Sequence, residues 1–174
     1  AFNAQARAPL LKLEATKDVP ALTLHRAHRW HLFLSHIWGT GQDQCATIKR
    51  QLTLLMPGVS IFLDVDDLKD IGALEEYVDQ SAVIMIFVSK GYFKSGNCLR
   101  EARCTVAKQK PITLCFDPVK GGEKLQVIKN DECPDDLRHP IFDGRMNDRA
   151  ISASGERDVI EWHRIKDFQL VSLK

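Results

Sequence analysis

Residues 82–88 read AVIMIFV, seven apolar residues in a row. A strand that is apolar at every position is typical of a parallel sheet whose two faces are both covered by helices. Helical patterns are predicted on either side of it, at 72–80 and at 97–108, where Pro111 ends the second helix. We therefore place 82–88 in the middle of an α/β domain.

Strands and helices alternate outward from this centre. The other predicted strands are 31–35, 59–63, 112–116 and 159–162, and the other predicted helices are 43–56 and 165–173. The helix at 43–56 has one apolar face, formed by Cys45, Ile48, Leu52 and Leu55. This alternation predicts right-handed βαβ units, and we expect a flavodoxin-like three-layer domain with a five-stranded parallel sheet in the order 2-1-3-4-5. Acidic residues 64–71 are predicted as a loop, as are 120–125 and 146–158, and no element is assigned to 126–145.

Composition limits the class of function. The chain has 174 residues, 24 Lys plus Arg against 23 Asp plus Glu, and a formal net charge of +1. This balance argues against nucleic-acid binding, and the apolar runs are too short for direct membrane insertion. We divide the chain into an N-terminal lead-in segment, 1–29, and one domain, 30–174.

The cysteines and histidines suggest neither disulfides nor a metal site. There are five cysteines, an odd number, and no C-x-x-C pair, which favours free thiols in a reducing, cytoplasmic setting. His25, His28 and His31 are spaced by three, so an extended segment would point successive rings to opposite faces. We expect no metal ligands among them.

The predicted strand order locates a candidate site. In open α/β sheets ligands bind outside the carboxyl ends of the strands, where the strand order reverses. The loops that meet there are 35–42, which contains SHIWGTGQ, and 89–95, followed by the helix that carries Glu101. Both features have a plainer interpretation: 35–42 as a tight turn with a partly buried Trp38, and Glu101 as a solvated residue near a helix N-terminus.

Common motifs of other α/β and calcium-binding proteins are missing. The stretch DVDDLKD, 64–70, fails as an EF-hand because Leu68 and Lys69 stand where a ligand and a glycine are required. A phospho-accepting receiver domain would need an acidic pair after the first strand, where this chain has Ser35 and His36. No G-x-G-x-x-G, G-x-x-x-x-G-K-[ST] or G-x-S-x-G occurs, so dinucleotide-binding, P-loop and α/β-hydrolase functions are not supported.

Several stretches in order resemble a Toll/interleukin-1 receptor (TIR) domain. HLFLSH is similar to the first conserved box of that family, and IEWHR occupies the place of its tryptophan-containing third box. Between them, residues 61–102 resemble the central stretch: a strand, an acidic loop, a short helix, an apolar strand ending in Ser, and a helix opening with C-x-x-E. The match covers 30–116 well and 158–173 loosely.

The resemblance implies one of two functions. Some TIR domains cleave NAD+ to nicotinamide and ADP-ribose or a cyclic form in immune or cell-death signalling, and others are non-enzymatic scaffolds that associate with other TIR domains. The enzymes need the Glu of the C-x-x-E stretch, which here is Glu101, three residues after Cys98. Two departures count against the enzyme: Asn97 stands where plant enzymes have Trp, and their Arg shortly after the first-box Ser is missing.

The chemistry of NAD+ cleavage suits a lone carboxylate. The leaving pyridinium departs as neutral nicotinamide, so no general acid is required, and one ionised carboxylate can stabilise the oxocarbenium-like transition state. We predict that Glu101 is catalytic, that NAD+ is a substrate rather than a cofactor, and that the acidic stretch with Asp66 and Asp67 contacts a second copy. The predicted NAD+-binding residues are Ser35, His36, Trp38, Gly39, Thr40 and Cys98.

Overall fold

The computed structural model describes residues 10–13, 15–67, 71–143 and 157–163. Its sheet has five strands, all parallel, in the order β2-β1-β3-β4-β5, which confirms the predicted topology. The strands are β1 Trp30–Ser35, β2 Ile61–Phe62, β3 Ser81–Val88, β4 Ile112–Phe116 and β5 Val159–Glu161. β3 is the central strand, and it is buried from Ile84 to Val88, as its unbroken apolar sequence predicted.

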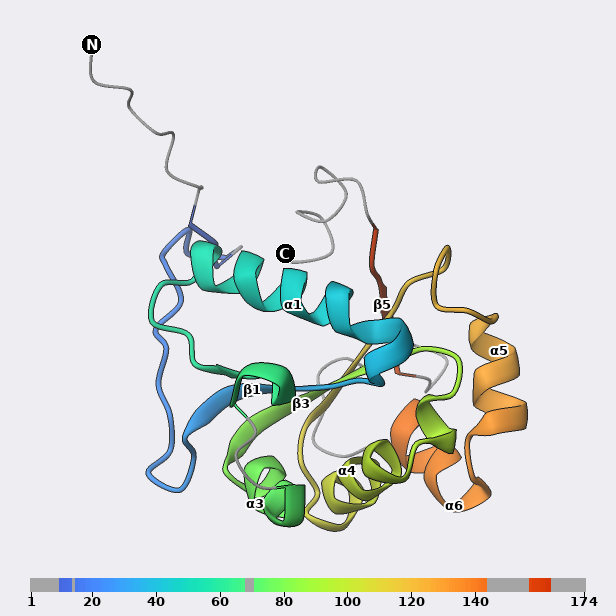
Figure 1. The fold of residues 1–174 in the computed structure, drawn as a ribbon. Helices are drawn as coiled ribbons and strands as arrows, with labels where there is room; N and C mark the ends of the chain where they lie inside the picture. The colour runs from blue at the N-terminus through green and yellow to red at the C-terminus, as the bar shows by residue number, and fades with distance from the viewer. Residues whose placement is uncertain (1–9, 14, 68–70, 144–156, 164–174) are drawn as a thin grey trace.

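Helices cover both faces of the sheet (Figure 1). The helices are α1 Trp38–Leu55, α2 Asp64–Asp67, α3 Leu74–Asp79, α4 Gly96–Ala107, α5 Leu125–Val127 and α6 Asp135–Arg138. Short 3-10 turns, η1 Ile71–Ala73 and η2 Tyr92–Lys94, precede α3 and α4, and π-helical turns, η3 Ile128–Glu132 and η4 His139–Asp143, follow α5 and α6.

Two apolar clusters lie on opposite sides of the sheet. On one side α1 packs its predicted apolar face against β1, β3 and β4, and the buried Trp162 joins this cluster. On the other side α3, α4 and the helical segment 125–143 pack around a stack of rings that includes Phe33 and Phe62, whose centroids are 4.7 Å apart. Burial on both faces is what holds the carboxyl ends of β1 and β3 side by side.

The predicted loop 35–42 is wrong from residue 38 onward, because α1 begins at Trp38 rather than at 43. The N–H of Gly41 donates to the carbonyl of Ile37 at 2.9 Å, which closes the first turn. A Cβ at Gly41 would lie 3.1 Å from the Cβ of His36 and 3.2 Å from Cδ1 of Phe87. This glycine therefore serves close packing of the helix on the sheet, and not the approach of a ligand to a loop.

Helices also occur in the predicted loop 64–71 and in a stretch to which the sequence assigned no element. Asp64–Asp67 is the helix α2, and the chain from 125 to 143 is largely helical although Pro134 and Pro140 interrupt its pattern. The predicted helix 165–173 and most of the predicted loop 146–158 lie outside the described residues. The division at residue 29 stays a prediction. Nowhere in the described ranges is a helix both long and apolar enough for a membrane span.

Candidate functional site

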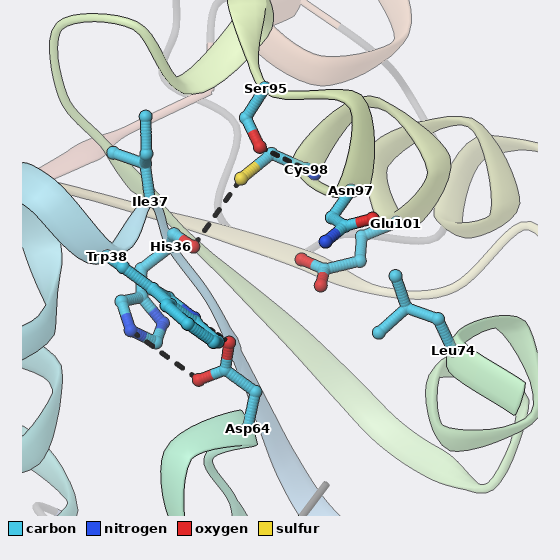
Figure 2. Close-up of a pocket in the computed structure, with 9 residues that line it drawn as sticks. All are labelled: His36, Ile37, Trp38, Asp64, Leu74, Ser95, Asn97, Cys98 and Glu101. Atoms are coloured by element: carbon cyan, nitrogen blue, oxygen red, sulfur yellow. Dashed lines mark hydrogen bonds and ion pairs between the residues drawn. The ribbon is translucent and has the colours of Figure 1, made fainter. Parts of the chain in front are cut away.

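A pocket of about 260 Å³ opens at the carboxyl ends of β1, β2 and β3 (Figure 2). This is the position that the sequence analysis predicted, between β1 and β3, where the strand order reverses. Its walls come from the start of α1, from α2 and α3, and from the start of α4. The lining residues are His36, Ile37, Trp38, Asp64, Leu74, Ser95, Asn97, Cys98 and Glu101.

Glu101 reaches the pocket from α4. The helix starts at Ser95, whose hydroxyl accepts the N–H of Cys98 at 3.4 Å, and this cap fixes the turn that carries the glutamate. Glu101 is only 5% exposed. Its Oε2 accepts a hydrogen bond from the hydroxyl of Ser35, while its Oε1 has no hydrogen-bond partner among the described residues. One carboxylate oxygen is thus held and the other is available.

The electrostatics of Glu101 differ from the sequence-based expectation of an ionised carboxylate. The pKa of Glu101 is raised to about 8, chiefly by burial, against the lowering effect of the Ser35 hydrogen bond and with a smaller raising effect of nearby Asp64. The side chain is therefore mostly protonated at neutral pH in the free protein. A carboxyl group tuned in this way in a pocket is typical of functional sites.

Ser35 supports Glu101 and does not line the pocket. It is the last residue of β1, is fully buried, and lies 2.5 Å from the hydroxyl of Tyr92. A serine hydroxyl has one hydrogen to give, and when that hydrogen goes to Glu101 the phenol must be the donor to Ser35. Burial raises the pKa of Tyr92, which keeps the phenol protonated for this purpose. The resulting chain of hydroxyls orients the carboxyl group.

Glu132 fixes the turn that carries Tyr92. Oε2 of Glu132 accepts the N–H of Gly91 at 2.7 Å, and Gly91 has a φ of +84°, a conformation that favours glycine. The position of Tyr92, and through it the Ser35–Glu101 bond, therefore depends on the segment 125–143, where the sequence predicted no helix or strand.

Asp64 is a second carboxylate in the pocket, and the sequence analysis did not assign it there. The indole N–H of Trp38 donates to its Oδ2, and Nε2 of His36 lies 3.6 Å from its Oδ1. Nδ1 of His36 lies 3.2 Å from the carbonyl of Leu34 and must be the donor in that contact. Figure 2 shows Trp38, His36 and Asp64 on one side of the pocket and Glu101 on the other.

Cys98 holds two elements together at the pocket wall. Its thiol donates to the carbonyl of His36 at 3.4 Å and so joins α4 to the end of β1. Burial raises the pKa of Cys98 to about 12, and the neighbouring Glu101 contributes in the same direction. The thiol is therefore neutral and is not poised as a nucleophile.

Besides Ser35, two predicted binding residues, Gly39 and Thr40, lie outside the pocket lining. Gly39 is exposed, with no atom within 4 Å of where a Cβ would be, and Thr40 bonds Ser89 through their hydroxyls at 2.7 Å. Of the predicted set, the structure gathers four around the pocket: His36, Trp38, Cys98 and Glu101. It adds residues that were not assigned, of which Asp64 and Leu74 come from the far wall.

Comparison with known proteins gives a fold but no family. No family model matches the chain, and no curated protein sequence matches it. A solved structure of a metazoan TIR-STING receptor from C. gigas, in complex with 2′,3′-cGAMP, is similar with a TM-score of 0.54 and 14% identity over 87% of this chain and 41% of that one. The fold is TIR-like.

A second structure of the C. gigas receptor is similar to the TIR-like domain with a TM-score of 0.49 and 14% identity, over 68% of this chain and 38% of that one. The chain therefore spans about two fifths of the length of the receptor chains that it resembles. At this identity the likeness concerns the fold, and the activity has to be argued from the pocket.

Proposed function

We propose that this chain is an NAD+ glycohydrolase built on a TIR-like fold. The observation that carries the proposal is the carboxyl group of Glu101, which is buried at the carboxyl end of the sheet with one oxygen held by Ser35 and the other without a hydrogen-bond partner in the described structure. A fixed carboxylate in a site partly closed to water is well suited to stabilise positive charge that develops in a transition state.

The chemistry requires little else. The bond between C1′ of the ribose and the ring nitrogen breaks, and its electron pair stays on the nitrogen, so nicotinamide leaves as a neutral molecule. The positive charge moves to C1′ and the ring oxygen, where ionised Glu101 stabilises it. Water then adds to C1′ and loses a proton, giving ADP-ribose, or a nucleophilic atom of the same molecule adds instead and gives a cyclic product.

The residues around Glu101 have supporting roles in this proposal. Trp38 and His36 line the wall on the opposite side, with Cys98 between the two halves of the pocket. Ser35 acts through Glu101, and Thr40 and Gly39 act through the shape of the start of α1. The five cysteines are free thiols, which fits a reducing, cytoplasmic setting, and we include immune or cell-death signalling and self-association in the proposal.

A non-enzymatic scaffold that signals by TIR–TIR association is the competing function. Two observations favour it: Glu101 is mostly neutral at pH 7, and a pocket of about 260 Å³ is smaller than the ~300–1,000 Å³ of typical sites for drug-sized ligands. Such a pocket encloses part of a dinucleotide and not all of it. The two functions differ in whether the carboxyl group of Glu101 is required for activity.

The deciding experiment is incubation of concentrated protein with NAD+, with nicotinamide release followed by chromatography. We expect release by the wild-type chain and none by Glu101→Gln or Glu101→Ala, each with a normal circular dichroism spectrum. Glu75→Gln is the matched control, because Glu75 pairs with Arg100 at 2.7 Å beside Glu101 but does not line the pocket. Release by Glu101→Gln at the wild-type rate, or none by the wild-type chain at any concentration, would favour the scaffold.

A further inference from the structure

The pocket contains two acidic side chains and no permanently cationic one. Asp64 and Glu101 are both among its described lining residues, and none of those residues is Lys or Arg. An anionic group such as a phosphate would find repulsion here and no base to bind. The polarity of the lining therefore suits a ligand with positive charge.

The available oxygen of Glu101 points to such a ligand. The side chain is 5% exposed, and no described residue bonds its Oε1. Figure 2 shows the carboxyl group directed into the pocket, between Asn97 and Leu74. A carboxylate oxygen that faces a pocket and has no protein partner there can accept a contact from a ligand.

Asp64 is held in a fixed orientation across the pocket. Its side chain is 12% exposed, the Trp38 indole N–H donates to Oδ2, and His36 Nε2 lies 3.6 Å from Oδ1. Nε2 of His36 is itself buried and has no hydrogen-bond partner in the described structure. Apolar surface beside the two acids comes from Ile37, Leu74 and the exposed ring of Trp38. A flat, cationic ring can pair its charge with the acidic side chains and pack its faces on the apolar surface.

We propose that Asp64 and Glu101 together form a recognition site for an aromatic cation, the pyridinium ring of an N-riboside, and that this charge is the main determinant of binding in the pocket. The inference rests on the proposed function for the identity of the cation. It makes Asp64 a binding residue, and it leaves the phosphates and the second nucleoside outside this pocket.

Binding of the cation also prepares Glu101 for its role. A positive charge beside a protonated carboxyl group favours its ionised form, so the proton of Glu101 is released when the ring enters. Among the groups around Glu101, Asp64 and Glu75 oppose its ionisation and Arg100 favours it. Burial raises the pKa of Tyr92, Cys98 and Cys45, which are neutral, and His36 lines the same pocket.

The test uses two compounds of nearly equal shape, 1-methylnicotinamide, a cation, and 3-methylbenzamide, its neutral counterpart. Neither has a glycosidic bond, so their binding is independent of whether the chain cleaves NAD+. By titration calorimetry at pH 7 we expect the cation to bind at least about tenfold more tightly, since a charge pair in a partly buried site is worth more than one decade of affinity. In buffers of different ionisation enthalpy, the cation alone should release a proton.

Variants separate the two acids. Asp64→Asn keeps an acceptor for Trp38 and should remove most of the preference for the cation, while Asp67→Asn on the same helix, outside the pocket lining, should leave it unchanged. Glu101→Gln should retain part of the preference but release no proton. Equal affinity for the two compounds, no binding of either at millimolar concentration, or a full preference in Asp64→Asn would overturn the inference.

Discussion

The hydroxyl of Ser35 donates its hydrogen bond to Oε2 of Glu101, so the last residue of β1 holds a carboxyl group of α4. A hydrogen bond to the charged form of an acid lowers its pKa, and here it opposes the larger effect of burial. The pH at which Glu101 ionises is therefore set by a side chain outside the pocket lining, and this can be tested.

Ser35→Ala should move the pH dependence of NAD+ cleavage to higher pH. In the wild-type chain we expect kcat/KM to rise with an apparent pKa near 8, the value that burial gives to Glu101 in the free protein. A hydrogen bond to a charged group contributes about 1.5–3 kcal/mol, which is roughly one to two pH units. Ser89→Ala is the control, since Ser89 is also fully buried beside β3 but bonds Thr40. Equal shifts in both variants would show a general packing effect.

Glu101→Gln should stabilise the fold at alkaline pH. The pKa of Glu101 is about 8 in the folded chain and about 4.5 in the reference state, so unfolding releases a proton between these two values and the free energy of unfolding falls as pH rises through this window. Each pH unit costs up to ~1.4 kcal/mol, several kcal/mol in total above pH 8. Gln has no such loss. Urea melts at pH 5 and pH 9 should show a gap between the two proteins that widens with pH, and a constant gap would contradict the assigned pKa.

Trp38→Ala should weaken NAD+ binding with little effect on melting temperature. Trp38 is 59% exposed, so the core does not depend on it, but its ring lines the pocket and its N–H holds Asp64. We expect a loss on the order of 1 kcal/mol or more in binding. Trp38→Phe should be intermediate because it keeps a ring and loses the donor. Leu54→Ala, 53% exposed on the same helix away from the pocket, should bind NAD+ normally.

Asp67, in the acidic stretch, has contacts within the chain that affect how self-association can be tested. Asp67 accepts the N–H of Leu63 at 2.9 Å and bonds Lys49 at 2.7 Å, so it is committed within the chain. Asp67→Lys should therefore lower the free energy of unfolding by ~2 kcal/mol, because a backbone donor and a lysine both lose their acceptor. The loss should appear as a lower melting temperature. Charge reversal at Asp67 would therefore test folding and association together.

Specific activity should still rise with protein concentration if a second copy completes the site. A net charge of +1 offers little long-range repulsion to association. Sedimentation and nicotinamide release measured over one dilution series should rise together, and Asp66→Lys should reduce both. Constant specific activity in a strictly monomeric sample would remove association from the mechanism.

The sequence predicted those parts of the fold that depend on which segments are buried. The apolar run 82–88 is typical of a strand buried on both faces, and its alternation with helices indicated a doubly wound parallel sheet. The order 2-1-3-4-5 was expected of a flavodoxin-like domain. The start of α1 was not predictable in the same way, because Gly39 and Gly41 favour a loop locally. What selects the helix is the close packing of Gly41 on His36 and on Phe87, which is distant in the sequence. Tertiary packing outweighed local propensity there.

In the pocket, too, some residues could be predicted from the sequence and others could not. Glu101 was found because it follows a recognisable pattern at the predicted switch point. Asp64 was missed although a signal existed: it comes directly after the second strand, and the order 2-1-3 places that strand's end beside the end of β1. The contacts of Ser35 with Tyr92 and of Glu132 with Gly91 had no such signal, since each joins residues that only the finished packing brings together.

The central place of β3 also affects how the chain is made. Trp30 in β1 pairs with Ser81, about fifty residues later, so a growing chain leaves the ribosome with β1 lacking its main partner until β3 follows. β3 then emerges as an uninterrupted apolar segment before β4, which covers its other edge, has been synthesised. During synthesis this interval is when the chain is most open to aggregation, and the same residues that make the sheet secure once folded are the ones that need protection before then.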